Sequence, residues 1–262
     1  MNRKEWNKEH KKLISEEKRL INSHLKEKAS FLNDTVERFL PEGIQEKLNT
    51  AFVKGFEVVF SKGLGIVEKT YNKSLKEQEF RINQYAMGQR DKRSMSGFKQ
   101  SAIRSSRKNM VLSGAEGTAF GVLGIGLPDI PVFIAMIMKA MQEIAVSYGF
   151  TYDSDEEKIF MLTLIRAAVT YGDDFVSQNI SVGKKICGIE KIETNLTEEI
   201  ELTASALSER LLYMKFVQGI PIVGIIGGLS DFTVMKDVSK YARFAYKKRF
   251  LRGLWEKMRG SE

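Results

Sequence analysis

The chain has 262 residues, of which 43% are hydrophobic and 28% charged, and this balance excludes a disordered protein and allows a sizeable core. The formal net charge of +8 favours an acidic partner, which could be nucleic acid, an anionic membrane surface or an acidic protein. The single cysteine, Cys187, excludes an internal disulfide, and the charged start of the chain lacks the apolar segment of a signal peptide, so we expect a cytoplasmic protein.

Helical periodicity dominates the first part of the chain. Residues 1–30 predict a charged helix with a thin apolar stripe, which we expect to be peripheral. Pro41 is expected to open a second helix, in which apolar residues recur at spacings of three and four over residues 44–60. A third helix is expected over about residues 64–86, followed by a basic, serine-rich segment at residues 89–108.

Two helices are expected in the middle of the chain, with recognisable signals at their ends. Pro131 is expected to begin the first, and Gly149 is a residue typical of the position that follows a helix. Ser154 and Glu157 have the spacing of a capping box, so the next helix is expected to begin there.

Two more helices are expected, one from about Thr197 and one from about Ser230 toward the C-terminus. Strict alternation of apolar and polar residues is almost absent, so strands have little support. The sequence therefore predicts an all-α, multi-helix domain. Residues 1–88 are expected to form helices peripheral to a core made by residues 89–262, within one continuous fold.

Two glycine-rich apolar runs, FGVLGIGLPDI at residues 120–130 and VGIIGGLSDF at residues 223–232, align as a short pseudo-repeat. Glycines about three residues apart can let another helix approach closely, and an aspartate follows each run where a new helix should begin. We therefore expect two glycine-rich helical hairpins. Their motif residues are Gly121, Gly124, Gly126, Pro128, Asp129, Pro131, Gly219, Pro221, Gly224, Gly227 and Asp231.

Each hairpin has two interpretations, a tightly packed soluble core or a segment that enters a bilayer. Residues 117–138 contain one charged residue, Asp129, and are long enough to span a membrane. A central aspartate costs about 2.5–3.5 kcal/mol on insertion scales, and two prolines interrupt the helix at the same place. The second run is shorter than the ~20 residues of a span. A re-entrant or buried hairpin therefore fits better than two spans.

The segments SGAEGTAFGVLGIGLPDIPVFIAMIMKAMQEIAVSYGF and KFVQGIPIVGIIGGLSDFTVM, with YKKRFL near the end, resemble the EcsC protein family of bacteria. The resemblance covers roughly residues 95–251, and its most specific pieces are GLPDIP, QEIAVSYG and QGIPIVG. It implies an α-helical accessory factor associated with the cytoplasmic side of the membrane, and an ABC transporter as a possible partner. Lys139 stands where the family pattern leads us to expect an arginine, which keeps the charge but loses any bidentate contact.

No catalytic, metal or cofactor site is predicted. Both histidines, His10 and His24, lie in the charged N-terminal helix, which we expect to lie outside the core. Metal-binding patterns are absent, and GVLGIG and SVGKKICG lack the order of nucleotide-binding loops. The resemblance adds no catalytic residues. Asp129, Glu143 and Asp231 are the candidates for a polar site.

The basic charge lies beside apolar segments and without a nucleic-acid motif, which favours lipid headgroups over nucleic acid. In the last helix, Lys236, Lys240, Arg243 and Lys247 share one side, which predicts a basic face for a membrane surface. Beyond Lys247 the apolar pattern rotates, so we expect a bend near Lys248 or a tail that packs separately.

We therefore expect a non-enzymatic accessory protein that associates peripherally with the inner face of the cell membrane. It is expected to act on a membrane partner, for which the resemblance suggests an ABC transporter. The alternative is a soluble enzyme that handles a lipid or small molecule, with Asp129 and Asp231 in a cavity between the two hairpins.

Overall fold

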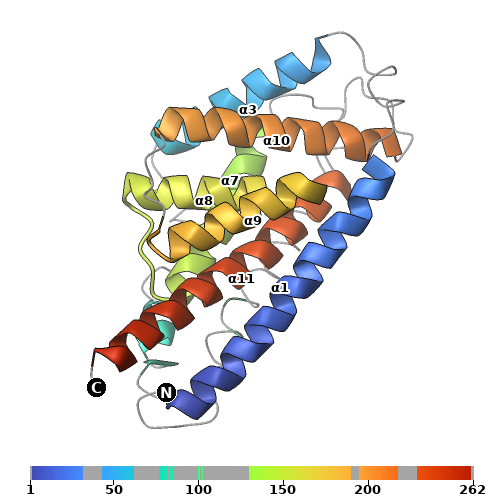
Figure 1. Cartoon of the computed structure of the whole chain (residues 1–262). Helices are drawn as coiled ribbons and strands as arrows, with labels where there is room; N and C mark the ends of the chain where they lie inside the picture. The colour runs from blue at the N-terminus through green and yellow to red at the C-terminus, as the bar shows by residue number, and fades with distance from the viewer. Residues whose placement is uncertain are drawn as a thin grey trace.

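The computed structural model describes residues 2–31, 43–61, 77–81, 83–84, 100, 102, 130–189, 195–217 and 229–260. Every regular element among these residues is helical, so the prediction of an all-α fold is confirmed. The main helices are α1 (Arg3–Phe31), α3 (Ile44–Ser61), α7 (Ile130–Ser147), α8 (Asp155–Val169), α9 (Gly172–Ile186), α10 (Leu196–Val217) and α11 (Leu229–Arg259) (Figure 1).

The ends of α7 and α8 follow the local signals in the sequence. Gly149 has a φ of 80°, and its N–H donates to the carbonyl of Val146 at 2.9 Å, which ends α7 in the left-handed glycine conformation. The Ser154 hydroxyl accepts a hydrogen bond from the N–H of Glu157 at 3.3 Å and caps α8. Both predicted boundaries are confirmed.

Two other helix starts depart from the expectation. α10 begins at Leu196, because the side chain of Asn195 accepts a hydrogen bond from the N–H of Thr197 at 3.1 Å and acts as the cap. The sequence analysis did not identify α9. Its N-cap residue, Tyr171, makes no side-chain capping bond, so the sequence carries no capping signal there.

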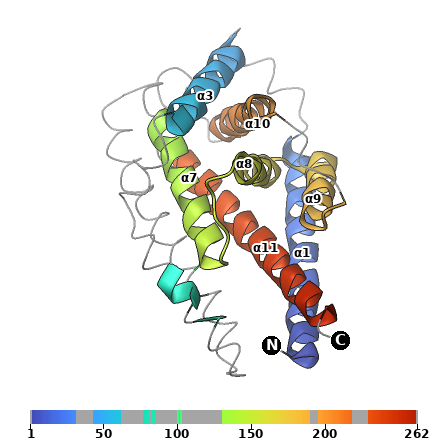
Figure 2. The same ribbon diagram turned by 90° about the vertical axis from the view of Figure 1, so that its left-hand side faces the viewer.

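The helices form a layered bundle with α8 at its centre (Figure 2). One side of α8 packs on α10, another on α11, and α9 lies alongside. α7 packs against α3 and α11, and α3 also lies along α10. α1 covers α9 and α11 on the opposite side of the bundle from α3. Since α8 is enclosed by three helices, burial accounts for the mostly apolar stretch over residues 159–169.

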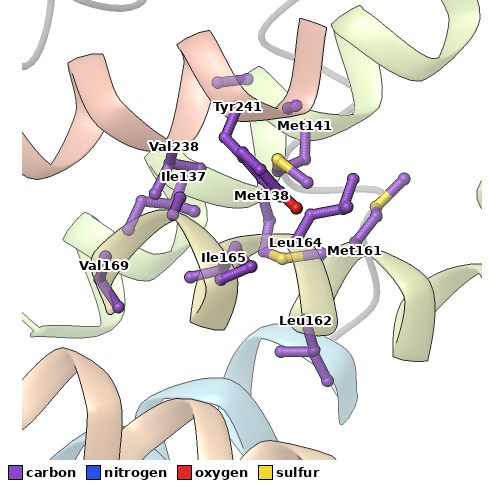
Figure 3. Close-up of a cluster of buried hydrophobic side chains, with 14 of the residues drawn as sticks. Ile137, Met138, Met141, Met161, Leu162, Leu164, Ile165, Val169, Val238 and Tyr241 are labelled. Carbon is purple, nitrogen blue, oxygen red and sulfur yellow. The ribbon is translucent and has the colours of Figure 1, made fainter. Parts of the chain in front are cut away.

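One apolar core joins these layers. Figure 3 shows Met138 and Met141 of α7, Leu164 and Ile165 of α8, and Tyr241 of α11 packed together, and all are fully buried. The predicted apolar face of α3 joins the same cluster through the buried residues Leu48, Phe52, Phe56 and Val59. The described parts of residues 1–88 and 89–262 therefore share a core.

α7 is the one described helix that is long and apolar enough to cross a membrane, with a mean hydropathy of 1.5 over Ile130–Ser147. However, 78% of this segment is buried inside the protein. The structure thus places most of residues 130–138 of the predicted membrane-entering segment in the core, with Val132 exposed, while residues 117–129 lie outside the described residues.

α3 and α7 cross closely at Gly55. A Cβ atom added to Gly55 would lie 2.5 Å from Cδ1 of Ile134 and 3.2 Å from Cγ2 of Ile130. A close helix crossing at a glycine was expected in the glycine-rich runs, and here it occurs at a glycine that the sequence analysis did not single out. The absence of a side chain at Gly55 therefore allows this contact.

We predict that Gly55→Leu destabilises the protein by about 1–3 kcal/mol, because the larger side chain overpacks the crossing. Gly253→Ala is the matched control, since a Cβ atom at Gly253 in α11 would meet nothing within 4 Å. Alanine there should stabilise the helix by about 0.5–1 kcal/mol. Urea unfolding of both variants would measure these changes, and an unchanged midpoint for Gly55→Leu would show that the crossing is not tightly packed.

Candidate functional site

The exposed side of α1 is basic where its side chains are described. Within residues 2–26, every exposed charged residue is a lysine or arginine, and the glutamates are half-buried. Ile14 and Leu25 add apolar surface and are 41% and 40% exposed. At 100° per residue these cations cover about half of the helix circumference. We call this set the basic outer face: Arg3, Lys4, Lys8, Lys11, Lys12, Lys18, Arg19 and Lys26.

The glutamates of α1 lie at the edge of its inner side, where α11 packs. Glu9 forms an ion pair of 3.2 Å with Lys247 of α11, and it also bonds Lys12 of its own helix. Burial raises the pKa of Glu9, but Lys12 and Lys247 outweigh this effect and hold the pKa below its ordinary value. Glu9 is therefore a charged partner for α11.

A second contact links α1, α9 and α11. Lys248 of α11 donates to Glu17 of α1 at 2.8 Å, and the Asn179 amide of α9 donates to the same carboxylate at 3.0 Å. The buried hydroxyl of Tyr241 donates to the Asn179 carbonyl oxygen at 2.9 Å. These bonds satisfy polar groups at the meeting point of the three helices and determine which side of α1 faces inward.

The predicted basic face of α11 is only partly exposed. Lys236 and Lys240 are exposed, and Arg243 is half-buried. Lys247 is only 6% exposed, because α1 covers it and supplies Glu9 as its partner. The placement of Lys247 on an open membrane-facing surface was therefore wrong.

α11 continues as one helix past Lys248 to Arg259. Of the apolar residues that rotate into place beyond Lys248, Phe250 and Leu251 are buried, and Leu254 and Met258 are half-buried. α1 packs on this part of α11, where the indole N–H of Trp6 donates to the Leu251 carbonyl at 2.9 Å. The C-terminal part of α11 is thus packed against α1.

Most residues of the predicted glycine-rich hairpins lie outside the described residues. Pro131 is in the first turn of α7, and the backbone of Asp231 is in the first turn of α11. Whether Asp129 and Asp231 converge therefore stays a prediction. The other motif residues outside the described part are Gly121, Gly124, Gly126, Pro128, Gly219, Pro221, Gly224 and Gly227.

Glu143, the third candidate for a polar site, lies in α7 and is only 2% exposed. Its backbone carbonyl accepts a hydrogen bond from the Ser147 hydroxyl at 2.6 Å. The neighbouring residues Lys139 and Gln142 are also buried, so α7 carries a short polar stretch within its apolar sequence. Glu143 is therefore an interior residue of the described fold.

A buried ionic cluster joins α8, α9 and α10. Arg166 of α8 lies 2.9 Å from the carboxylate of Glu199, whose side chain is fully buried. Lys185 of α9 donates to the Thr163 hydroxyl of α8 at 3.3 Å. Burial raises the pKa of Glu199 above its ordinary value, even though Arg166 and Lys185 favour the charged form. The sequence analysis missed this cluster because its members come from three helices.

The side chain of Glu157 was expected to take part in a capping box, but it bonds to another helix. Its carboxylate accepts hydrogen bonds from the Tyr246 hydroxyl at 2.7 Å and from Arg249 at 2.6 and 2.9 Å. The Arg249 guanidinium lies 4.4 Å from the ring centre of Phe150 and 4.9 Å from that of Phe160. Glu157 therefore joins the start of α8 to α11 through a charge-assisted contact.

His24 lies in the core, so the expectation that it lies outside was wrong. It is 8% exposed, and its ring stacks on Phe175 of α9 at 3.8 Å. Its Nδ1 lies 2.8 Å from the carbonyl of Leu20 in the preceding turn of α1. α1 does fold back onto the core, and there His24 packs as an aromatic side chain.

Within the described ranges, no group of three or more His, Cys, Asp or Glu residues is placed to hold a metal ion. Cys187 is a free, half-buried thiol at the C-terminal end of α9. The carboxylates of Glu9, Glu157 and Glu199 described above form ion pairs with residues of other helices. The basic outer face of α1 is therefore our candidate functional surface.

The cluster at Glu199 predicts a pH dependence of stability. Because its folded-state pKa is raised, the folded protein binds this proton more readily than the unfolded chain, and the associated stability is lost as pH rises through the folded pKa. Glu199→Gln removes that titration. The stability of the variant relative to the unmodified protein should therefore increase as the pH rises above the ordinary pKa of a glutamate, about 4.3.

Urea unfolding at several pH values would measure this difference. Glu198→Gln, at the exposed neighbouring position, is the control and should show no such trend. A difference for Glu199→Gln that decreases with pH would mean that the ion pair with Arg166 outweighs burial.

Comparisons with known proteins identify a family and two relatives. The model of the EcsC protein family matches residues 4–251. Two proteins of Bacillus subtilis (strain 168) are similar to this chain. Uncharacterized protein YdbA is 23% identical over 140 residues, which are 51% of each chain. Protein EcsC is 24% identical over 149 residues, which are 54% of this chain and 58% of the relative. The chain thus spans about half the length of these relatives, and no solved structure gives a significant match. Because the family model covers nearly the whole sequence, the chain belongs to the EcsC protein family.

Proposed function

We propose that the protein is a non-enzymatic accessory protein that associates peripherally with the inner face of the cell membrane and acts there on a membrane partner, such as an ABC transporter. The observation that supports the membrane part of this proposal is the basic outer face of α1. The transporter as partner rests on the family resemblance.

The basic outer face has the composition of a lipid-binding surface. A lysine or arginine near an anionic membrane surface contributes about 1 kcal/mol to binding, and this contribution falls as salt screens the charges. Ile14 and Leu25 lie on the same exposed side and supply apolar contact with the headgroup boundary. A row of cations along a 29-residue helix can therefore hold the protein on anionic lipid without a membrane span.

The charge on α10 differs in sign from that on α1. The exposed charged residues whose side chains are described in α10 are all acidic, namely Glu198, Glu201 and Glu209. Anionic lipid attracts the surface of α1 and repels that of α10. This asymmetry would orient the protein on the membrane and leave α10 directed away from the lipid.

The alternative of a soluble enzyme depends on Asp129 and Asp231. The side chains of both residues lie outside the described ones, and no observation in the described part favours a reaction.

We predict that reversing four charges of the basic outer face, in the combined variant Lys8→Glu, Lys11→Glu, Lys18→Glu and Arg19→Glu, abolishes binding to vesicles that contain phosphatidylglycerol. Losing the four attractive contributions alone amounts to about 4 kcal/mol, or on the order of a thousandfold in affinity. Flotation with vesicles at low and high salt would measure binding, and circular dichroism would check helicity.

The matched control reverses four exposed lysines elsewhere: Lys47 and Lys54 of α3, and Lys236 and Lys240 of α11. It changes the net charge equally and should retain most of the binding. If this control loses binding while the α1 variant keeps it, the predicted face on α11 is the contact and the role of α1 is refuted. If both variants bind like the unmodified protein, neither basic face is used.

A further inference from the structure

Both tryptophans of the chain lie together where α1 begins and α11 ends, at the shared end of the bundle that holds the two termini (Figure 1). The ring centres of Trp6 and Trp255 are 4.6 Å apart, and Trp6 also stacks on His10 at 4.5 Å. The Arg3 guanidinium lies 5.7 Å from the ring centre of Trp255. We call Arg3, Trp6, His10 and Trp255 the tryptophan corner.

The two indole rings are placed between the protein and its surroundings. Both are half-buried, so each keeps a part of its surface exposed. The polar N–H of Trp6 is already bonded to the Leu251 carbonyl at 2.9 Å, so it needs no water partner. An aromatic ring whose polar group is satisfied can move into a less polar medium without leaving a donor unpaired. Tryptophan is enriched at the headgroup level of membranes because its ring is amphipathic, with an apolar body and a polar edge.

The surroundings of the tryptophan corner are cationic. The two nearby acids are engaged, since Glu5 accepts from the N–H of Asn2 at 3.1 Å and Glu256 bonds Arg252 at 2.7 Å. Exposed cations lie along the same end of both helices. They are Arg3, Lys4 and Lys8 near the start of α1, and Lys257 and Arg259 near the end of α11.

We propose that the tryptophan corner enters the headgroup region of an anionic bilayer, so that the shared end of α1 and α11 lies deeper than the other end of α1. This inference rests on the proposed function and specifies which part of the surface contacts lipid most closely. The charge of the surrounding cations complements anionic headgroups, and the indole rings fit the boundary beneath them. The other end of α1 offers Leu25 and Lys26 on its exposed side but no aromatic ring among the described side chains.

Intrinsic fluorescence tests the proposal directly, because both fluorescent tryptophans belong to the tryptophan corner. The full chain would be mixed with phosphatidylglycerol–phosphatidylcholine vesicles whose acyl chains are brominated, and with otherwise identical unbrominated vesicles. We expect a blue shift with both vesicles and loss of most of the emission with the brominated ones. The variants Trp6→Phe and Trp255→Phe, each with one tryptophan left, would show which ring is closer to lipid.

A second readout compares the two ends of α1. In a Cys187→Ser background, Lys4→Cys and Lys26→Cys would each carry an environment-sensitive label. The label at position 4 should shift to the blue on anionic vesicles, while the label at position 26 should shift much less. Equal shifts at both positions would mean that α1 lies flat on the surface, and this would overturn the proposed tilt.

Flotation of the same samples separates this inference from the proposed function. If the protein floats with the vesicles but its tryptophans are not quenched, the tryptophan corner only joins α1 to α11, and the inference is overturned while membrane association stands. If the protein does not float with anionic vesicles, membrane association is itself refuted, and the inference with it.

Discussion

The ion pairs between α1 and α11 determine the surface of this protein. Glu9 pairs with Lys247 and Glu17 with Lys248, so the acids of α1 are held at the inner side while its lysines face outward. Lys247 is nearly buried, and removing one partner of a buried pair typically costs about 3–5 kcal/mol. The same orientation places Trp6 against Trp255. The basic outer face and the tryptophan corner both depend on this arrangement.

Behind α1, two buried carboxylates of the helical scaffold are paired across helices. Glu157 bonds Arg249, and Glu199 lies beside Arg166, so each of these two carboxylates meets a guanidinium from another helix. Pairing of this kind lets charged residues enter an apolar core and defines the position of each helix against its neighbour. These carboxylates therefore have a structural explanation that needs no reaction.

The apolar character of the chain and its basic charge have separate explanations. The most hydrophobic described helix, α7, lies mostly inside the bundle, so its hydropathy reflects core packing. Among the side chains that the structure describes, the exposed charged residues are all basic on α1 and all acidic on α10. A protein with these surfaces can bind an anionic membrane from one side by charge and interfacial aromatic residues, which is the basis of our proposal.

The sequence by itself determined the features that depend on near neighbours in the chain. The helical character of the described residues, the buried stripe of α3, the end of α7 at Gly149 and the cap at Ser154 follow from periodicity and from side chains within one helical turn. The family could also be identified from local motifs. Tertiary structure decided the rest: Lys247 is covered, His24 lies in the core, and Glu157 bonds α11. The partners in these contacts lie at least 89 residues apart in the chain, as for Glu157 and Tyr246, so no spacing rule connects them. Which side of α1 is exposed depended on charges in α11, because an amphipathic helix can be oriented only by the surface against which it packs.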